Sequence, residues 1–378
     1  MKVPFNTVHL TGRESELVNQ VLQSGHLHGN GPFSKNCCKY FEKRYGVKKA
    51  LLTSSCTDAL EMAALLCRLG PGDEVILPSY TFASTANAFE LRGVDLKFAD
   101  SQKHHPNIDT EEVKRLISPR TKALVVVHYG GVACEMDKLM DLARKHEFYV
   151  IEDAAQAIDA YYKERPLGTI GHLGTFSFHQ TKNVMSGEGG LLSINHDPFL
   201  GRSEIVGEKG TDRSRFIRGE VNKFGWVELG SSFLASEITA AVLQAQLEAL
   251  PEIQKRRVQA WERYYDGLAP LASETTFQIL QPGPHGSNNA HLFGLVCSNP
   301  KLCSDFLNFA KKEGVSAVRH YVPLHLSQYF TPFYSGPDLV NVTKFEGCLT
   351  RLPLFADISD AQLKKVIHVV TQFFRANS

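Results

Sequence analysis

Hydroxyl side chains gather in the segment 53–59, between an apolar run and a helical pattern. Backbone N–H groups at the start of a helix have no helical acceptor, so together with such hydroxyls they form a ready site for a phosphate. Ser55 or Thr57 could instead be an ordinary helix cap, which is so common that this segment alone favours the cap.

A carboxylate and an aromatic ring follow two further apolar runs. Asp153 ends the run 148–153, and burying it is costly unless it meets a cation such as a protonated ring nitrogen, a structural arginine or a helix N-terminus. Phe82 comes shortly after the run 74–78 and could stack on a planar ligand, although a phenylalanine more often belongs to the core. Each residue therefore has a structural interpretation beside the functional one.

Lys182 stands between a β-rich run and the glycine-rich segment 187–190. Most lysines are simply exposed, but a lysine in a cleft near apolar or cationic groups loses its proton readily and can form a Schiff base with an aldehyde. Glycines there would let the backbone approach a flat ring. A phosphate site, a stacking ring, a carboxylate for a pyridinium nitrogen and a lysine for an aldehyde are together the partners that pyridoxal phosphate needs.

The elements that must position these residues alternate between strands and helices from residue 47 to about 195. The predicted strands are 48–54, 74–78, 123–128 and 148–153, and the predicted helices include 56–70 and 135–146. Such alternation is typical of a mostly parallel sheet covered by helices, in which ligands bind at the carboxyl ends of the strands. Asp109 and Glu112 are spaced as a capping box for a further helix.

The second half of the chain has a different pattern. Residues 231–270 predict long helices, 281–289 predict a loop, and apolar residues at helical spacing predict an amphipathic helix over 359–375. We therefore expect a large α/β domain at 1–250, with the N-terminal segment, and a smaller α+β domain at 251–378 that includes a linking helix.

Composition excludes several classes of protein. Forty-one Lys and Arg face 40 Asp and Glu, a net charge of +1, so no global field would hold nucleic acid or an anionic membrane. No stretch approaches ~18 apolar residues, the length of a membrane span. The eight cysteines include no CxxC pair, which predicts neither a metal site nor a redox pair. We expect a cytoplasmic protein with free thiols and no membrane insertion.

The motifs, taken in order, resemble the DegT/StrS-type nucleotide-sugar aminotransferases. They are the segments 54–60, 78–88, 126–131, 151–157, 177–183 and 187–190, and the likeness continues from 28–46 to 321–325 and 351–355. Within the family the chain is most similar to the dTDP-4-amino-4,6-dideoxygalactose transaminases, through 168–183, 208–224, 230–237 and 288–293. The resemblance implies a pyridoxal-phosphate-dependent transferase of fold type I, with a mostly parallel central sheet flanked by helices.

The resemblance also implies roles for the cofactor site. Lys182 matches the Schiff-base lysine, and Asp153 matches the partner of the pyridine nitrogen. Gln156 matches the residue beside the 3-hydroxyl, and Phe82 matches the ring that stacks on the cofactor. The residues that match the phosphate site are Ser55, Cys56, Thr57, Asp58 and Ser177.

In the family a neighbouring subunit supplies one more phosphate contact, usually an asparagine. Ser232 stands at that position here, as in the most similar subgroup. The resemblance therefore implies a homodimer with shared active sites.

The substrate side has two matching regions. The basic residues Arg213, Arg215, Arg218 and Lys223 could meet a nucleotide diphosphate, or they could form a solvated loop. His320, Tyr321 and His325 match a region near the sugar, although a core tyrosine and surface histidines would explain them nearly as well.

The activity implied is a two-stage transfer of an amino group from L-glutamate, which leaves 2-oxoglutarate, to C4 of a dTDP-linked 4-keto-6-deoxyhexose. The product would be a 4-amino-4,6-dideoxy sugar for a cell-surface polysaccharide such as the lipopolysaccharide O-antigen. Two alternatives are amination of a 3-keto sugar at C3 and a cofactor-binding regulator without catalysis. A related dehydratase branch has a histidine in place of the lysine, so Lys182 disfavours it.

Overall fold

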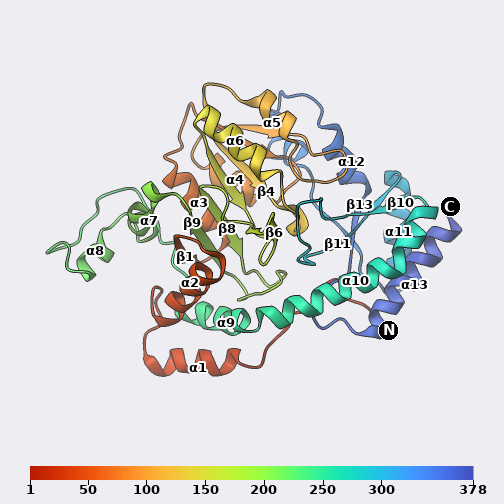
Figure 1. The fold of residues 1–378 in the computed structure, drawn as a ribbon, viewed down its shortest axis with the longest axis horizontal. Coiled ribbons are helices and arrows are strands. Elements are labelled where there is room, and N and C mark those ends of the chain that lie inside the picture. Colours follow the sequence, from red (N-terminus) through yellow and green to blue (C-terminus); the bar gives the residue numbers. More distant parts are fainter. Residues whose placement is uncertain (378) are drawn as a thin grey trace.

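A seven-stranded sheet forms the centre of the computed structural model, which describes residues 1–377 (Figure 1). Its strand order is β1-β9-β8-β5-β4-β2-β3. The strands are β1 Lys49–Thr53, β2 Glu74–Pro78, β3 Asp95–Ala99, β4 Thr121–Val127, β5 Tyr149–Asp153, β8 Leu173–Ser177 and β9 Gly190–Ile194. Only β9 runs against the others, pairing antiparallel with both β1 and β8. The predicted α/β class with a mostly parallel sheet is confirmed.

Helices cover both faces of this sheet because its strands are apolar on both sides. In β2, Val75 and Leu77 pack into one hydrophobic core and Ile76 packs into the other. The first face is covered by α3 Cys56–Leu66, α4 Ser84–Glu90 and α7 Leu200–Gly207. The second face is covered by α2 Pro32–Tyr45, α5 Thr110–Leu116, α6 Met136–His146 and α9 Glu237–Glu248.

Local chemistry moved several predicted boundaries. Helix α3 ends at Leu66 rather than at 70, and Arg68 takes a left-handed φ of 54°. Helix α9 begins at Glu237, where the Ser236 side chain accepts from the N–H of Thr239. The capping box at Asp109 is wrong in detail, because Asp109 accepts from the N–H of Glu111 and Glu112 pairs with an arginine instead.

A second, antiparallel sheet occupies the C-terminal part of the chain. Its order is β10-β11-β13-β12, and its strands are β10 Phe277–Ile279, β11 Phe293–Cys297, β12 Val318–Arg319 and β13 Leu349–Leu352. Helices α10 Leu250–Glu274, α11 Pro300–Lys312 and α13 Asp360–Ala376 pack with it around a separate core. Helix α13 confirms the predicted amphipathic helix, and Ser359 and Gln362 form its capping box.

The two halves of the chain are interleaved at their boundary. Val3 bridges to Val315 and packs in the second core. Helix α12 Val340–Cys348 instead contributes Val342 and Phe345 to the core of the large sheet. The division of the chain at residue 250 stays a prediction, although α10 starts at that position.

An arm carrying the short helix α8 Arg213–Ile217 projects from the body on the left of Figure 1. The remaining elements are α1 Glu14–Ser24, a small hairpin of β6 Tyr161–Tyr162 and β7 Arg165–Pro166, and the 3-10 turns η1 Tyr129–Gly131, η2 Asp197–Phe199, η3 Leu324–Leu326 and η4 Thr331–Phe333. Within residues 1–377, no helix is both long and apolar enough to cross a membrane.

Candidate active site

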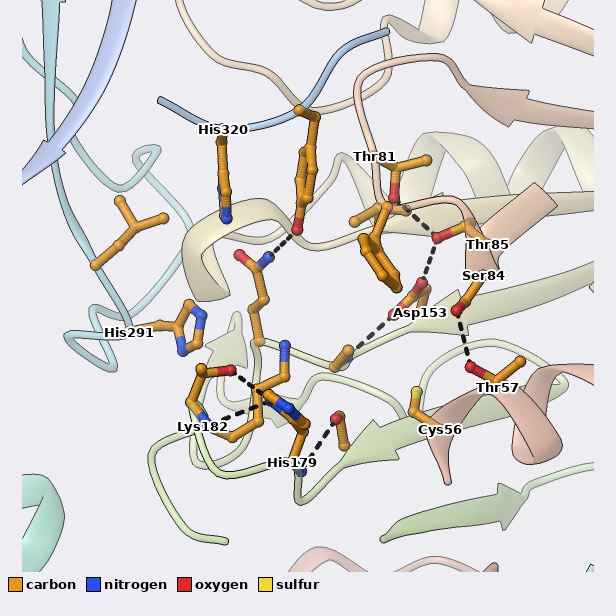
Figure 2. Close-up of a pocket in the computed structure, with 18 of the residues that line it drawn as sticks. Cys56, Thr57, Thr81, Ser84, Thr85, Asp153, His179, Lys182, His291 and His320 are labelled. Carbon is orange, nitrogen blue, oxygen red and sulfur yellow. Dashed lines mark hydrogen bonds between the residues drawn. The ribbon is translucent and has the colours of Figure 1, made fainter. Parts of the chain in front are cut away.

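A cavity of about 640 Å³ lies where the large sheet meets the second sheet. One wall consists of residues that follow β1, β2, β5 and β8 at their carboxyl ends, as expected for a doubly wound sheet. The opposite wall includes His291, His320 and Arg351 from around β11, β12 and β13. Figure 2 shows the side chains that converge on this space.

Lys182 lies in the turn after β8, where its N–H donates to the carbonyl of His179 at 2.9 Å. Its ammonium forms no hydrogen bond or ion pair with any residue in the described part of the chain. Burial lowers the pKa of Lys182, and the positive charge of Arg351 lowers it further, while Cys56 and Asp153 act in the opposite direction. The result is an amine that gives up its proton easily and faces open space.

Asp153 ends β5 and is 6% exposed. The hydroxyl of Thr85 donates to one carboxylate oxygen at 2.7 Å, and the N–H of Ala155 donates to the other at 3.1 Å. Burial raises the pKa of Asp153, and these two hydrogen bonds counteract the rise. A protonated nitrogen in the cavity would supply the cation that this carboxylate lacks.

The N-terminus of α3 opens into the cavity at the position where the sequence predicts an anion site. The Ser55 side chain accepts from the N–H of Asp58 at 3.0 Å, so the capping interpretation is also confirmed. The Thr57 hydroxyl donates to that of Ser84 at 2.8 Å. Ser55, Cys56, Thr57 and Ser177 all line the cavity. Asp58 does not line it, because its carboxylate accepts from the hydroxyl of Ser54.

Gly190 lets β9 lie directly against this anion site. A Cβ on Gly190 would come within 2.3 Å of the carbonyl carbon and oxygen of Ser55 and within 2.4 Å of the nitrogen of Cys56. No side chain fits in that gap, so the glycine of the GEGG motif sets how closely the strand supports the phosphate loop.

Phe82 and Gln156 form two further sides of the cavity. The Phe82 ring is 61% exposed and lines the space, which leaves its face open to a planar ligand. Gln156 accepts from the N–H of Gly130 at 2.7 Å and donates to the hydroxyl of Tyr321 at 3.0 Å. Both predicted ring contacts therefore lie beside Lys182 and Asp153.

The segment after β12 is only partly in the cavity. His320 and Tyr321 line it and stack with ring centroids 4.0 Å apart. Burial lowers the pKa of His320 to about 2. His325 does not line the cavity, because its ring is 3% exposed and bonds the Ser79 hydroxyl at 2.6 Å. The alternative that His325 is a surface histidine is wrong as well.

The basic residues of the arm lie outside this cavity. Arg213 pairs with Glu208, and Arg218 pairs with Glu204 and Glu220. Arg215 also pairs with Glu220. Within one chain these residues form an exposed ion-pair cluster, and Ser232, which bridges to Glu208, does not line the chain's own cavity.

Sequence reasoning missed several residues that the structure brings to the cavity. The Thr85 hydroxyl donates a hydrogen bond to the Asp153 carboxylate, and the His291 ring shares a hydrogen bond of 2.9 Å with the side chain of Asn183. Arg351 belongs to the segment 351–355 that carried part of the resemblance, but no role was assigned to it. A cationic residue inside the mostly buried strand β13 was the available signal.

Comparison with known proteins gives a match to the DegT/DnrJ/EryC1/StrS aminotransferase family over residues 9–371. The chain belongs to this family. It is 32% identical over 377 residues to the spore coat polysaccharide biosynthesis protein SpsC of Bacillus subtilis, covering 97% of this chain and 96% of that protein.

Solved structures of other proteins have the same fold. Streptomyces venezuelae DesV matches with a TM-score of 0.90 and 28% identity over 98% of both chains. The aminotransferase TlmJ of Streptoalloteichus hindustanus matches with a TM-score of 0.90 and 27% identity over 100% of both chains. The family uses pyridoxal phosphate. This chain is a sugar aminotransferase of that family. Residues 1–377 contain no cluster of three or more His, Cys, Asp or Glu placed to hold a metal ion.

Proposed function

We propose that this protein is a pyridoxal-phosphate-dependent aminotransferase that moves the amino group of L-glutamate to C4 of a dTDP-4-keto-6-deoxyhexose. One observation carries the proposal. The buried amine of Lys182 has no partner and shares a cavity with the Asp153 carboxylate, which lacks a cation, and with a hydroxyl-lined helix N-terminus. These three groups are matched to an aldehyde, a pyridinium nitrogen and a phosphate.

The residues present fit the cofactor. When bound, pyridoxal phosphate supplies an aldehyde and a ring that accepts the electron pair released at the amino-bearing carbon. Lys182 would hold the aldehyde carbon, Asp153 the ring nitrogen, and Gln156 the 3-hydroxyl. The first-turn N–H groups of α3, with the hydroxyls of Thr57 and Ser177, would hold the phosphate.

Lys182 would also move the proton. Because burial and the Arg351 charge lower its pKa, the released amine could carry a proton between the amino-bearing carbon of the substrate and the aldehyde carbon of the cofactor. Phe82 covers one face of the cofactor position and thereby limits water there. Glutamate and the sugar would use the same cavity in turn, with 2-oxoglutarate leaving between them.

The sugar and nucleotide assignments draw on sequence likeness. The name of SpsC refers to polysaccharide biosynthesis, which supports a product destined for a surface polysaccharide. His320 and Tyr321 form the wall that a hexose would face. Amination at C3 is the alternative regiochemistry.

A homodimer in the cytoplasm completes the proposal. The arm exposes several large apolar side chains, which a second subunit would cover: Trp226 at 80%, Ile217 at 64% and Val227 at 56%. In such a dimer Ser232 and the basic residues of the arm would reach the partner's cofactor phosphate and nucleotide diphosphate. Lys223, which forms no ion pair within residues 1–377, is free for that role.

Borohydride reduction of the purified protein, followed by peptide mass mapping, tests the central assignment. The expected result is a single pyridoxyl adduct on Lys182, and an adduct elsewhere would contradict it. The sugar assignment is tested by supplying 3-keto and 4-keto dTDP sugars separately. Turnover of only the 3-keto sugar would replace C4 with C3 amination, and absence of any turnover with bound cofactor would favour the regulator.

A further inference from the structure

Arg351 on β13 is a cation without a counterion in the wall of the cavity. Its guanidinium forms no hydrogen bond or ion pair with any of residues 1–377, and its Nε is sealed from solvent. The groups that act most strongly on it are the phenols of Tyr129, Tyr321 and Tyr80. Burial raises the pKa of each of these phenols, to about 12 for Tyr321, so none of them carries a compensating negative charge.

A buried arginine elsewhere in the same chain shows what a structural role looks like. Arg257 is 3% exposed and donates to the carbonyls of Ala290, His291 and Leu354 at 3.0–3.3 Å. Its hydrogen-bonding groups serve the fold. The guanidinium of Arg351, which is half-buried, has no such acceptors, and leaving its sealed Nε without a partner is costly. Its donors are therefore left for a ligand.

The guanidinium is oriented by an aromatic contact. Its central carbon lies 4.6 Å from the ring centroid of Phe5, which comes from the N-terminal segment and also lines the cavity. A ring over one face of a guanidinium leaves its edge, with the N–H donors, for a second partner. A planar carboxylate is the partner that such an edge binds with two parallel hydrogen bonds.

We propose that Arg351 binds the α-carboxylate of the amino acid that donates nitrogen. This inference rests on the proposed function, because it assumes an amino-acid donor. Arg351 lines the same cavity as Lys182, the amine at the reacting centre. In an amino acid the α-carboxylate is bonded to the same carbon as the amino group, so a cation beside the reacting amine meets it.

The other anions of the reaction fit this position less well. The cofactor phosphate would bind at Thr57, which is hydrogen-bonded to Ser84 and lies across the cavity from His320 in Figure 2. Arg351 is on the His320 side, since it pairs across the sheet with Val318, two residues before His320. The diphosphate of a sugar nucleotide is attached at the anomeric carbon, across the hexose ring from C4, and is therefore remote from the reacting amine.

The test uses the holoenzyme and measures the reaction with L-glutamate alone, followed by loss of the colour of the lysine-bound cofactor. Arg351→Gln should lower the second-order rate constant about 100-fold, the scale of lost charge-assisted hydrogen bonds, and Arg351→Lys should lose less. With 4-aminobutyrate, which is glutamate without its α-carboxylate, wild type and Arg351→Gln should react equally. Arg319→Gln, on the neighbouring strand with its side chain on Ser304, is the matched control and should behave as wild type.

Binding without reaction gives an independent readout. Glutarate has the two carboxylates but no amine, and its affinity should fall about 100-fold in Arg351→Gln. The melting temperature of this variant should equal or exceed that of wild type, because a half-buried charge whose Nε is sealed and unpaired is removed. A lowered melting temperature would assign Arg351 to the fold.

Three kinetic outcomes would overturn the proposal. A wild-type rate constant and glutarate affinity in Arg351→Gln would exclude a carboxylate subsite. An equal loss with 4-aminobutyrate would place Arg351 elsewhere on the donor, and a loss confined to the reaction of the aminated enzyme with the sugar nucleotide would assign it to the diphosphate. The sugar is not used in the glutamate reaction, so a wrong sugar assignment leaves this result unaffected.

Discussion

The hydrogen bond from Thr85 to Asp153 should control how tightly the cofactor is held. Thr85→Val keeps the shape of the side chain but removes the hydroxyl that donates to the buried carboxylate at 2.7 Å. Only the N–H of Ala155 then stabilises the charge. A hydrogen bond to a charged group contributes about 1.5–3 kcal/mol, so its loss should raise the pKa of Asp153 further above its ordinary value.

The assay is titration of the apoprotein with pyridoxal phosphate at pH 7–8, together with the rate of its reaction with L-glutamate. Because a carboxylate that is harder to ionise stabilises a pyridinium less, the affinity should fall about 10- to 100-fold. Thr81→Val is the graded control, since its hydroxyl contacts that of Thr85 at 2.8 Å and not Asp153 itself. Its effect should be smaller. Wild-type affinity and rate in Thr85→Val would refute the assignment of Asp153 as the partner of the ring nitrogen.

Three further predictions follow from single sites. Lys182→Ala should still bind pyridoxal phosphate by dialysis and absorbance but lose transamination, and near-wild-type turnover would refute its role. Gly190→Ala should weaken cofactor binding and lower the melting temperature, because its Cβ would collide with Ser55, whereas Gly201→Ala, which meets nothing within 4 Å, should not. Burial lowers the pKa of His105 to about 3 in the folded protein, whereas the unfolded chain takes up this proton near pH 6.5. The free energy of unfolding therefore decreases as the pH falls from about 6.5 to about 3. In urea unfolding at pH 7, 5 and 4, the free energy of unfolding should decrease less with falling pH for His105→Gln than for His104→Gln, a control at an exposed site. Equal decreases in the two variants would show that His105 is not the cause.

Local pattern was sufficient for the elements that carry the cofactor site. The strand at 74–78 and the helix at 136–146 followed from uninterrupted apolar runs and from helical spacing. Boundaries were less certain where one residue's conformation decided them, as at Arg68 after α3. The capping box at Asp109 failed because Glu112 found an arginine as partner.

Two neighbouring carboxylates show how the sheet separates roles that sequence leaves adjacent. Successive side chains of a strand point to opposite faces. Asp153 faces the cavity, whereas Glu152 faces away and accepts from the N–H groups of Gly168 at 2.8 Å and Ile170 at 2.7 Å. The parity of β5 makes Asp153 available to a ligand and Glu152 part of the fold.

The sequence by itself determined the α/β class and the cluster of Lys182, Asp153 and the α3 N-terminus, because all three follow strands whose carboxyl ends meet at one edge. Only the tertiary structure decided what the second sheet adds. It brings Arg351 into the cavity that Lys182 also lines, whereas His325 is buried outside the cavity against Ser79. Sequence spacing cannot specify such contacts, because they join segments about 170 and 246 residues apart through the packing of two separate sheets.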